Sequence, residues 1–365
     1  MRLVPLAGQT RALLREWMAA QNQPAFRADQ VLAGLHTRHE AGWEGLRELP
    51  AVLRDLMRQH FAFSTLSLAR QQGSQDSTRK FLWRMADGAL IESVLIPASP
   101  ALYGEGSDRH TLCVSTQVGC AYGCRFCASG LEGWKRHLEP SEIVEQVLAV
   151  ERLHRSEHPR SERRLINNLV IMGMGEPLAN YVNLMAALEV LNAAWGGNIG
   201  ARKITISTSG LVPQIRMLAD QPWQFRLALS LHGATDVVRS RIMPINRKYP
   251  LAELVEAAAY YQTRKKGMIT LEYILMAGVN DMPDQVAPLA RIAQRLRAKV
   301  NLIPYNTVEG LTWQRPAPDI SRRFHQLLLK EGVAATLRHE KGHDIDAACG
   351  QLRLRAEKEI AAALS

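Results

Sequence analysis

The chain has 365 residues, and its 47% hydrophobic share can fill the core of one large domain and a smaller one. It carries 45 lysines and arginines against 35 acidic residues, a formal charge of +10 that suits a polyanionic partner, although a merely basic protein would show the same value. The sequence has no apolar run of transmembrane length and no signal-peptide pattern, so we expect a cytoplasmic protein without membrane contact.

Helical periodicity marks the first part of the chain. Residues 1–62 contain "QTRALLREWMAA", "AFRADQVLAGLHTR" and "LPAVLRDLMRQHF", which predict a small helical N-terminal domain. Residues 63–98 follow as short alternating segments separated by Gly and Asp, which predict a small antiparallel β extension.

Six strand-like runs alternate with amphipathic helical segments between residues 99 and 355, and residues 356–365 form a C-terminal tail. The runs are "TLCVSTQV", "NNLVIMGM", "RKITISTS", "FRLALSL", "ITLEYIL" and "KVNLIP". This alternation predicts an α/β fold with a parallel sheet covered by helices, either open or curved into a barrel. Chemistry in such folds gathers at the carboxyl ends of the strands, which is where "GMGEP", "STSG" and "SLHG" fall.

Cysteines provide the most specific signal. Cys120, Cys124 and Cys127 are spaced closely enough to converge on one metal centre, and thiolates favour zinc or an iron-sulfur cluster. Cys113 could serve as a fourth zinc ligand, but its apolar neighbours place it in a strand. A cubane cluster on three thiolates would leave one iron open to another ligand.

The C-x3-C-x2-C spacing of "CAYGCRFC" resembles the signature of radical S-adenosylmethionine enzymes. With "MGMGEPLAN", "ITISTSG", "LSLHGATDVVRSRIMPIN", "NLIPYN" and "DIDAACGQL" in the same order, the chain resembles the RlmN/Cfr family of RNA methyltransferases. The resemblance implies a partial (β/α)6 TIM-like barrel, in which Cys120, Cys124 and Cys127 hold one 4Fe-4S cluster and S-adenosylmethionine binds the open iron. It also implies a monomer whose N-terminal domain is an accessory or RNA-binding unit, and an electron donor such as flavodoxin or ferredoxin.

The chemistry implied by the resemblance is methylation of adenosine carbon 2 in 23S rRNA, at the peptidyl transferase centre, and in tRNA at position 37. Two molecules of S-adenosylmethionine are used in each turnover. The first methylates Cys349, and a radical formed from the second removes a hydrogen atom from that methyl group. A transient protein-RNA adduct follows. Glu92 then takes a proton from the adduct, and Cys113 releases the product by forming a disulfide bond with Cys349.

The resemblance also implies a binding pocket for S-adenosylmethionine. Glu176 in "GMGEP" would receive the ammonium group of the cofactor, and Gly175 would allow close approach of the backbone. Further residues carried over from the family to this pocket are Ser207, Ser230, Leu231, His232 and Asn306. Without the resemblance, Glu92 reads as a solvent-facing strand residue, Cys349 as a small buried hydrophobe and His232 as a structural histidine.

Two alternatives stay open at this level. A Cfr-type enzyme would methylate carbon 8 of an adenosine in 23S rRNA and confer resistance to ribosomal antibiotics, and a metal-binding RNA-binding protein would not be an enzyme at all. His343 departs from the acidic residue more usual at its position. Candidate RNA contacts are the basic clusters at Trp134-Lys135-Arg136, Arg239 with Arg241, and Arg264-Lys265-Lys266.

Overall fold

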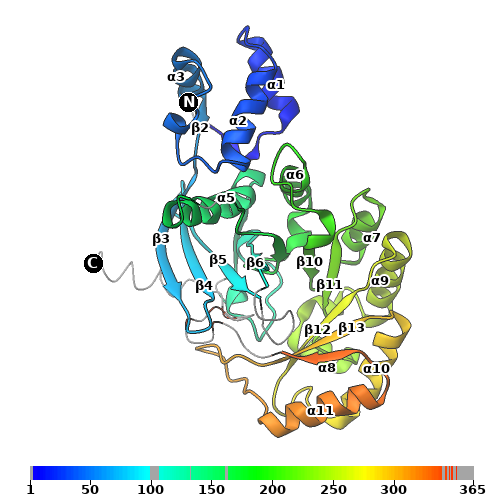
Figure 1. Cartoon of the computed structure of the whole chain (residues 1–365). Coiled ribbons are helices and arrows are strands. Elements are labelled where there is room, and N and C mark those ends of the chain that lie inside the picture. The colour runs from blue at the N-terminus through cyan, green and yellow to red at the C-terminus, as the bar shows by residue number, and fades with distance from the viewer. Residues whose placement is uncertain are drawn as a thin grey trace.

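The N-terminal helices form a small layer with its own core. The computed structural model describes residues 3–98, 107–131, 133–160 and 163–338, together with residues 342, 345, 347 and 351. The helices are α1 (Arg11–Ala20), α2 (Phe26–His36) and α3 (Ala51–His60), and β1 (Val4–Pro5) pairs in parallel with β2 (Phe61–Ala62). Thr10 caps α1 by accepting the amide of Leu13 at 3.2 Å. A separate apolar cluster that includes Leu14, Val31 and Met57 holds this layer together (Figure 1).

One ten-stranded sheet forms the rest of the molecule, in the order β14-β13-β12-β11-β10-β9-β6-β5-β4-β3. The strands are β3 (Leu66–Gly73), β4 (Arg79–Met85), β5 (Leu90–Pro97), β6 (His110–Cys113), β9 (Asn168–Ile171), β10 (Ile204–Thr208), β11 (Arg226–Ser230), β12 (Thr270–Leu275), β13 (Lys299–Pro304) and β14 (Ala335–Leu337). Strands β6 and β9 to β14 are parallel, whereas β3, β4 and β5 run antiparallel to their neighbours. The sheet is open, because β14 and β3 are its two edges.

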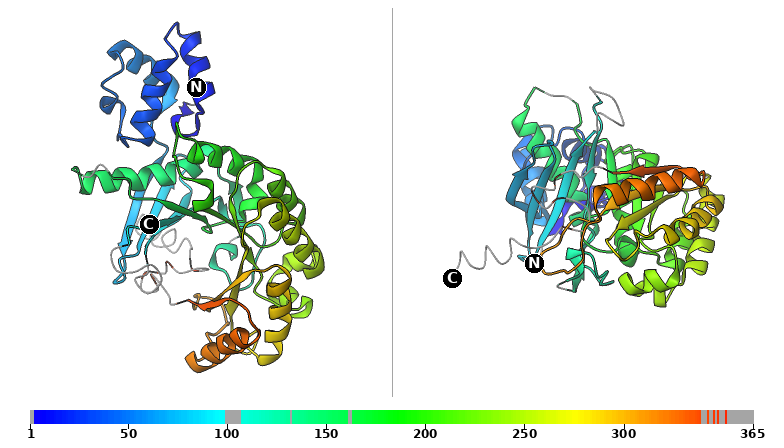
Figure 2. Two further views of the ribbon diagram at one scale, coloured as in Figure 1. Left: turned by 45° about the vertical axis from the view of Figure 1, so that its right-hand side comes forward. Right: turned by 90° about the horizontal axis from the view of Figure 1, so that it is seen from below.

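Helices cover the convex side of this sheet in an arc (Figure 2). They are α5 (Pro140–Glu157), α6 (Tyr181–Asn192), α7 (Val212–Asp220), α8 (Asp236–Ile242), α9 (Leu251–Lys265), α10 (Val286–Arg295) and α11 (Pro318–Lys330). A capping box between Glu139 and Glu142 begins α5. The predicted α/β class and partial barrel are therefore confirmed.

Three details differ from the sequence prediction. The run "TLCVSTQV" is two strands, since the chain leaves the large sheet after Cys113 and forms β7 (Gln117–Gly119), which pairs with β8 (Trp134–His137). Ser115 fixes this break, because its hydroxyl donates to the Glu92 carbonyl at 2.6 Å and accepts the Met174 amide at 2.9 Å. Strand β14 was not predicted, and the β extension is continuous with the main sheet through β5 and β6.

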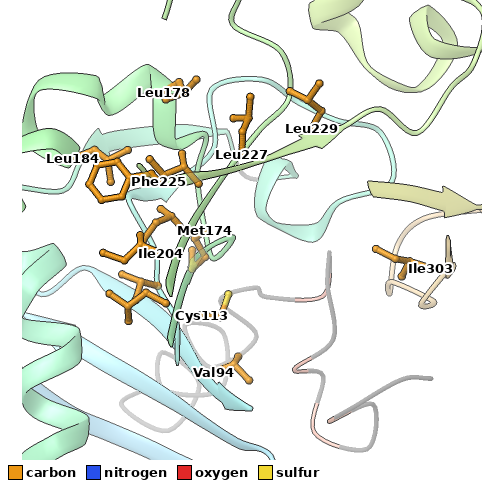
Figure 3. Packing of buried hydrophobic residues seen from close by; sticks show 14 of the residues in the cluster. Val94, Cys113, Met174, Leu178, Leu184, Ile204, Phe225, Leu227, Leu229 and Ile303 are labelled. Carbon is orange, nitrogen blue, oxygen red and sulfur yellow. The ribbon is translucent and has the colours of Figure 1, made fainter. Parts of the chain in front are cut away.

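The main core lies between the sheet and its helices. Its buried residues include Ile204, Leu227 and Leu229 from the sheet and Leu184 from α6 (Figure 3). Among the described residues, no helix combines the length and the apolar character needed to span a membrane.

Candidate active site

A pocket at the carboxyl ends of the strands brings the cysteines together with most of the expected cofactor residues. Its empty space, including the part open to solvent, is about 860 Å³, a size typical of small-molecule sites. The sequence-predicted residues that line it are Cys120, Cys124, Cys127, Gly175, Glu176, Ser207, Ser230 and His232. Segments more than 100 residues apart in the chain thus contribute to one site.

The cysteine loop is held closed by the β7–β8 hairpin. Gly119 has a φ of +73°, and a Cβ on it would collide with the Gly133 carbonyl, so glycine is required at this turn. The Cys120 amide donates to that carbonyl at 3.2 Å. The backbone therefore fixes where the first thiol stands.

The three thiols form a donor set that suits a soft metal centre. Burial and the nearby Cys127 raise the pKa of Cys120 to about 12, and burial holds the pKa of Cys124 well above its usual range. Thiols packed this closely repel one another as thiolates, and a cationic cluster would remove that repulsion. The residues present therefore fit a thiolate-bound iron-sulfur cluster, with Cys120, Cys124 and Cys127 as its ligands.

Glu176 is anchored beside the cysteine loop. Its two carboxylate oxygens accept the amides of Leu178 at 3.1 Å and Ser209 at 2.7 Å, and its own amide donates to Gln117 at 2.8 Å. Burial raises the pKa of Glu176, and the amide hydrogen bonds act in the opposite direction. Gly175, with a φ of +100°, leaves no room for a side chain because a Cβ would meet Gln117 at 2.5 Å. The chain can therefore present backbone and carboxylate together at this turn.

His232 presents a hydrogen-bond donor to the pocket. Its Nδ1 accepts the Ile274 amide at 3.1 Å, and burial, followed by Arg239, lowers the pKa of His232 to about 3. The ring is therefore neutral, with its proton on Nε2. Ser207 and Ser230 lie on adjacent strands with their hydroxyls 3.3 Å apart, so this wall of the pocket is polar.

Glu272 was missed by the sequence analysis. It lies on β12 and lines the pocket, and its Oε1 accepts from Asn301 at 3.0 Å while its buried Oε2 has no hydrogen-bond partner among the described residues. Burial raises the pKa of Glu272. An unpartnered acceptor facing the pocket fits a ligand that brings an N–H group, as S-adenosylmethionine does. A charged residue inside the apolar run "ITLEYIL" was the signal that could have identified it.

Arg239 was expected on the RNA-binding surface and instead lies under the pocket. It is fully buried and donates to the carbonyls of Leu231 at 3.0 Å and Ser209 at 2.5 Å, and to Asn246 Oδ1 at 2.8 Å. The RNA-contact hypothesis for Arg239 was therefore wrong. A buried guanidinium needs several acceptors, and the loops after β10 and β11 supply them, so Arg239 ties these two loops together.

Two other basic candidates are also engaged within the protein. Arg136 pairs with Asp87 and Glu142, both at 2.7 Å. Lys265 is buried at the end of α9, where its ammonium donates to the Gln221 carbonyl. These groups are held by protein acceptors and are less available to a phosphate than solvated cations are.

Glu92 and Cys113 lie outside the pocket lining but on the same face of the sheet. Both are buried, and Glu92 pairs with Lys80 at 3.2 Å rather than facing solvent. Cys113 is opposite Val94 on β5 (Figure 3) and Val170 on β9. Side chains alternate along a strand, and paired residues share a face.

The register carries this face across the sheet to the pocket. Val170 pairs with Thr205, two residues before Ser207, and Ser230 pairs with Glu272. Since Ser207 pairs with Ala228, two residues before Ser230, all these side chains share one face. Glu92 and Cys113 therefore project from the face that carries Ser207, Ser230 and Glu272.

The remaining sequence-predicted residues are placed as follows. Leu231 is buried, and its amide donates to the Glu272 carbonyl at 3.0 Å; Asn306 is buried just after β13. Neither lines the pocket. Cys349 and His343 lie outside the described residues. No disulfide bond is present among the described cysteines, and the Cys113–Cys349 disulfide stays a prediction.

Comparisons with known proteins agree with this site. Residues 114–289 match the Radical SAM superfamily. The chain is 50% identical over 354 residues to a probable dual-specificity RNA methyltransferase RlmN of Akkermansia muciniphila, with 97% of this chain and 96% of the relative covered. It is 51% identical over 357 residues to a probable dual-specificity RNA methyltransferase RlmN 3 of Opitutus terrae, with 97% and 96% covered.

A solved structure extends the agreement to three dimensions. The crystal structure of a radical SAM methyltransferase from Sphaerobacter thermophilus superposes with a TM-score of 0.89 at 41% identity, covering 96% of this chain and 99% of that chain. The cysteine loop, the pocket at the strand ends and these similarities lead to one conclusion: the chain belongs to the RlmN-type RNA methyltransferases of the radical SAM superfamily.

Proposed function

We propose that this enzyme methylates carbon 2 of an adenosine in 23S rRNA and of adenosine 37 in tRNA, through a methylated cysteine and a transient protein-RNA adduct. The observation that carries the proposal is the single pocket in which three cysteines meet Glu176, Ser207, Ser230 and His232. The named relatives, which are described as dual-specificity RNA methyltransferases, support two classes of RNA substrate.

The chain supplies ligands for the bound groups and orients them. Cys120, Cys124 and Cys127 would hold the 4Fe-4S cluster. Glu176, Gly175, Ser207, Ser230, Leu231, His232 and Asn306 would form the S-adenosylmethionine pocket. When bound, the cluster and two molecules of S-adenosylmethionine supply the methyl group and the radical chemistry, with electrons from a donor such as flavodoxin or ferredoxin. Radical chemistry suits this target because adenine carbon 2 is a poor nucleophile.

Three further residues would act on the RNA adduct. The Cys349 thiolate takes the methyl group and carries it to the base. The Glu92 carboxylate removes the proton from the methylated ring carbon. The Cys113 thiolate then attacks the Cys349 sulfur, so that an S–S bond forms, the bond from sulfur to the transferred carbon breaks and the methylated base leaves. A thiol reductant must restore both cysteines before the next turnover.

The experiment that tests this proposal is nucleoside mass spectrometry. Cluster-loaded protein is incubated anaerobically with reductant, S-adenosylmethionine and either 23S rRNA or tRNA. We expect 2-methyladenosine from both RNAs. Formation of 8-methyladenosine would assign a Cfr-type activity instead, and the absence of any methylated adenosine with an intact cluster would refute the proposal.

Cysteine variants test the roles separately. Cys349→Ala should give neither a methylated protein nor methylated RNA, because the methyl carrier is gone. Cys113→Ala should accumulate the protein-RNA adduct, visible as an RNA-dependent band that survives denaturation. Product formation at the normal rate by Cys113→Ala would remove this residue from the mechanism.

A further inference from the structure

A second polar pocket lies where the N-terminal layer meets the main sheet and its helices. Its empty space, including an open part, is about 660 Å³, and it shares no lining residue with the cysteine pocket. Four segments line it: the end of α2 with the turn after it, the second half of α5, the chain around Arg164, and the turn after α6. The Arg152 guanidinium, which donates to the Glu40 carbonyl at 3.0 Å, ties the same two parts together.

Positive charge outweighs negative charge in this pocket. Arg155, Arg163 and Arg164 line it, and Glu151 is its one acidic residue. Glu151 is already occupied, because its carboxylate accepts the amides of Leu165 at 3.1 Å and Ile166 at 2.7 Å. Its contact with the Arg164 Nε is longer, at 3.4 Å. One carboxylate with these internal partners cannot balance three guanidinium groups.

Several buried nitrogens in the pocket have no acceptor. The Nη2 of Arg164 and both ring nitrogens of His36 are inaccessible to solvent and make no hydrogen bond to any part of the chain that the structure describes. The His36 side chain is 96% buried. Such nitrogens cost about 1–3 kcal/mol each, more when charged, unless an acceptor arrives from outside the chain.

The local electrostatic potential agrees with an anionic ligand. Burial, followed by Arg164 and Arg155, lowers the pKa of His39 to about 4. Burial and positive neighbours, Arg164 and Arg152 among them, lower the pKa of His36 to about 3. Both effects record a region in which a cation is disfavoured and an oxyanion is favoured.

We propose that this pocket binds a phosphate group of the RNA backbone and so anchors the substrate between the N-terminal helices and the catalytic core. The inference rests on the proposed RNA methyltransferase function. Phosphate oxygens accept hydrogen bonds from arginine forks with favourable geometry, and phosphates take at least half of the hydrogen bonds in protein-nucleic acid complexes. Arg239 and Arg136, two of the basic residues suggested by sequence, are engaged within the protein, whereas Arg164 has donor capacity to spare.

The test compares Arg164→Gln with Arg160→Gln in the full-length, cluster-loaded protein. Arg160 is exposed in the same loop region and does not line the pocket, so its removal changes net charge equally. Binding of a fluorescent 23S rRNA fragment is measured without reductant at several KCl concentrations. We expect Arg164→Gln to weaken binding about tenfold. The slope of log Kd against log salt should fall by about 0.7–0.9, the value for one lost phosphate contact. Arg160→Gln should change each quantity less.

Inorganic phosphate serves as the second probe. At constant ionic strength it should raise the melting temperature of the wild type and of Arg160→Gln, but not of Arg164→Gln. Equal RNA affinity and equal salt slope in wild type and Arg164→Gln would overturn the proposal. A phosphate effect that disappears in Arg164→Gln without any change in RNA affinity would overturn it too, because the pocket would then hold free phosphate.

Folding and catalysis are controlled separately. Should Arg164→Gln fail to fold, the exposed Arg163 in the same pocket provides a second variant, Arg163→Gln, with a weakening in the same direction. The RNA affinity measurement requires no methyl transfer, so its outcome is independent of the proposed reaction. Methylation of RNA by a protein whose affinity does not depend on Arg164 or Arg163 would leave the proposed function standing and refute the phosphate site.

Discussion

The buried pair of Lys80 and Glu92 gives a prediction that connects stability with the proposed base. The Lys80 Nζ lies 3.2 Å from the Glu92 Oε1, and the two residues are only 7% and 3% exposed. Lys80→Met keeps most of the side-chain volume but removes the ammonium, which leaves a carboxylate buried beside an apolar group. Breaking a buried ion pair on one side costs about 3–5 kcal/mol.

The magnitude can be expressed as a melting temperature. An unfolding entropy of about 2.1 cal/mol/K per residue gives about 0.8 kcal/mol per kelvin for 365 residues, so the loss corresponds to about 4–6 °C. Glu92→Gln alone should destabilise as well, because it leaves the ammonium unpaired. The double variant Lys80→Met with Glu92→Gln should recover most of the loss, since no unpaired charge is left.

The assay is a double-mutant cycle by calorimetry on all four proteins, with equal cluster content. The coupling energy is the difference between the loss in the double variant and the sum of the two single losses. A coupling energy below about 1 kcal/mol would refute the reasoning, because an exposed or solvated pair gives values of that size. A double variant that folds and is stable but methylates no RNA would agree with the role proposed for Glu92.

Three further predictions concern the metal site, the pocket floor and the N-terminal layer. Cys124→Ser should abolish the brown iron-sulfur absorbance and the bound iron, whereas Cys113→Ser should keep both; retention of a full cluster by Cys124→Ser would contradict the ligand assignment. Arg239→Met should cost about 3–5 kcal/mol in chemical unfolding, because several buried acceptors lose their donor, and the exposed Arg241→Met should cost under about 0.5 kcal/mol. His36 has a folded pKa of about 3 against 6.5 when unfolded, so the unfolded chain binds an extra proton as pH falls from 6 to 4, and stability is lost. His36→Leu should lose about 1.4 kcal/mol less per pH unit in phosphate-free buffer; parallel pH profiles of the two proteins would exclude the buried neutral ring.

Local patterns in the sequence were sufficient for much of the fold. The six parallel strands are apolar runs between amphipathic helices, and this pattern survives without knowledge of tertiary contacts. The cysteine loop was identifiable for the same reason, since its ligands lie within eight residues, Cys120 to Cys127. Strand β14 was missed because it is a short edge strand of three residues with no strong apolar pattern.

Features that depend on distant partners could not be predicted. The break after β6 depends on Ser115, whose hydrogen bonds reach Glu92 and Met174. Arg239 reads as a surface cation until its acceptors assemble from separate loops. Glu272 reads as one polar residue in an apolar strand until the register with Ser230 turns it toward the pocket. In each case, the sequence shows the residue type, while the partner that gives it a role lies at least seven residues away.

The hairpin that closes the cysteine loop has a consequence for assembly of the holoenzyme. Pairing of β7 with β8, together with the hydrogen bond from Cys120 to Gly133, brings the two ends of the loop together through the protein's own backbone. The entropy of loop closure is therefore met during folding and not by the incoming metal. The unloaded protein can keep its native fold, and iron and sulfide added afterwards meet ligands already gathered, so reconstitution requires no refolding step.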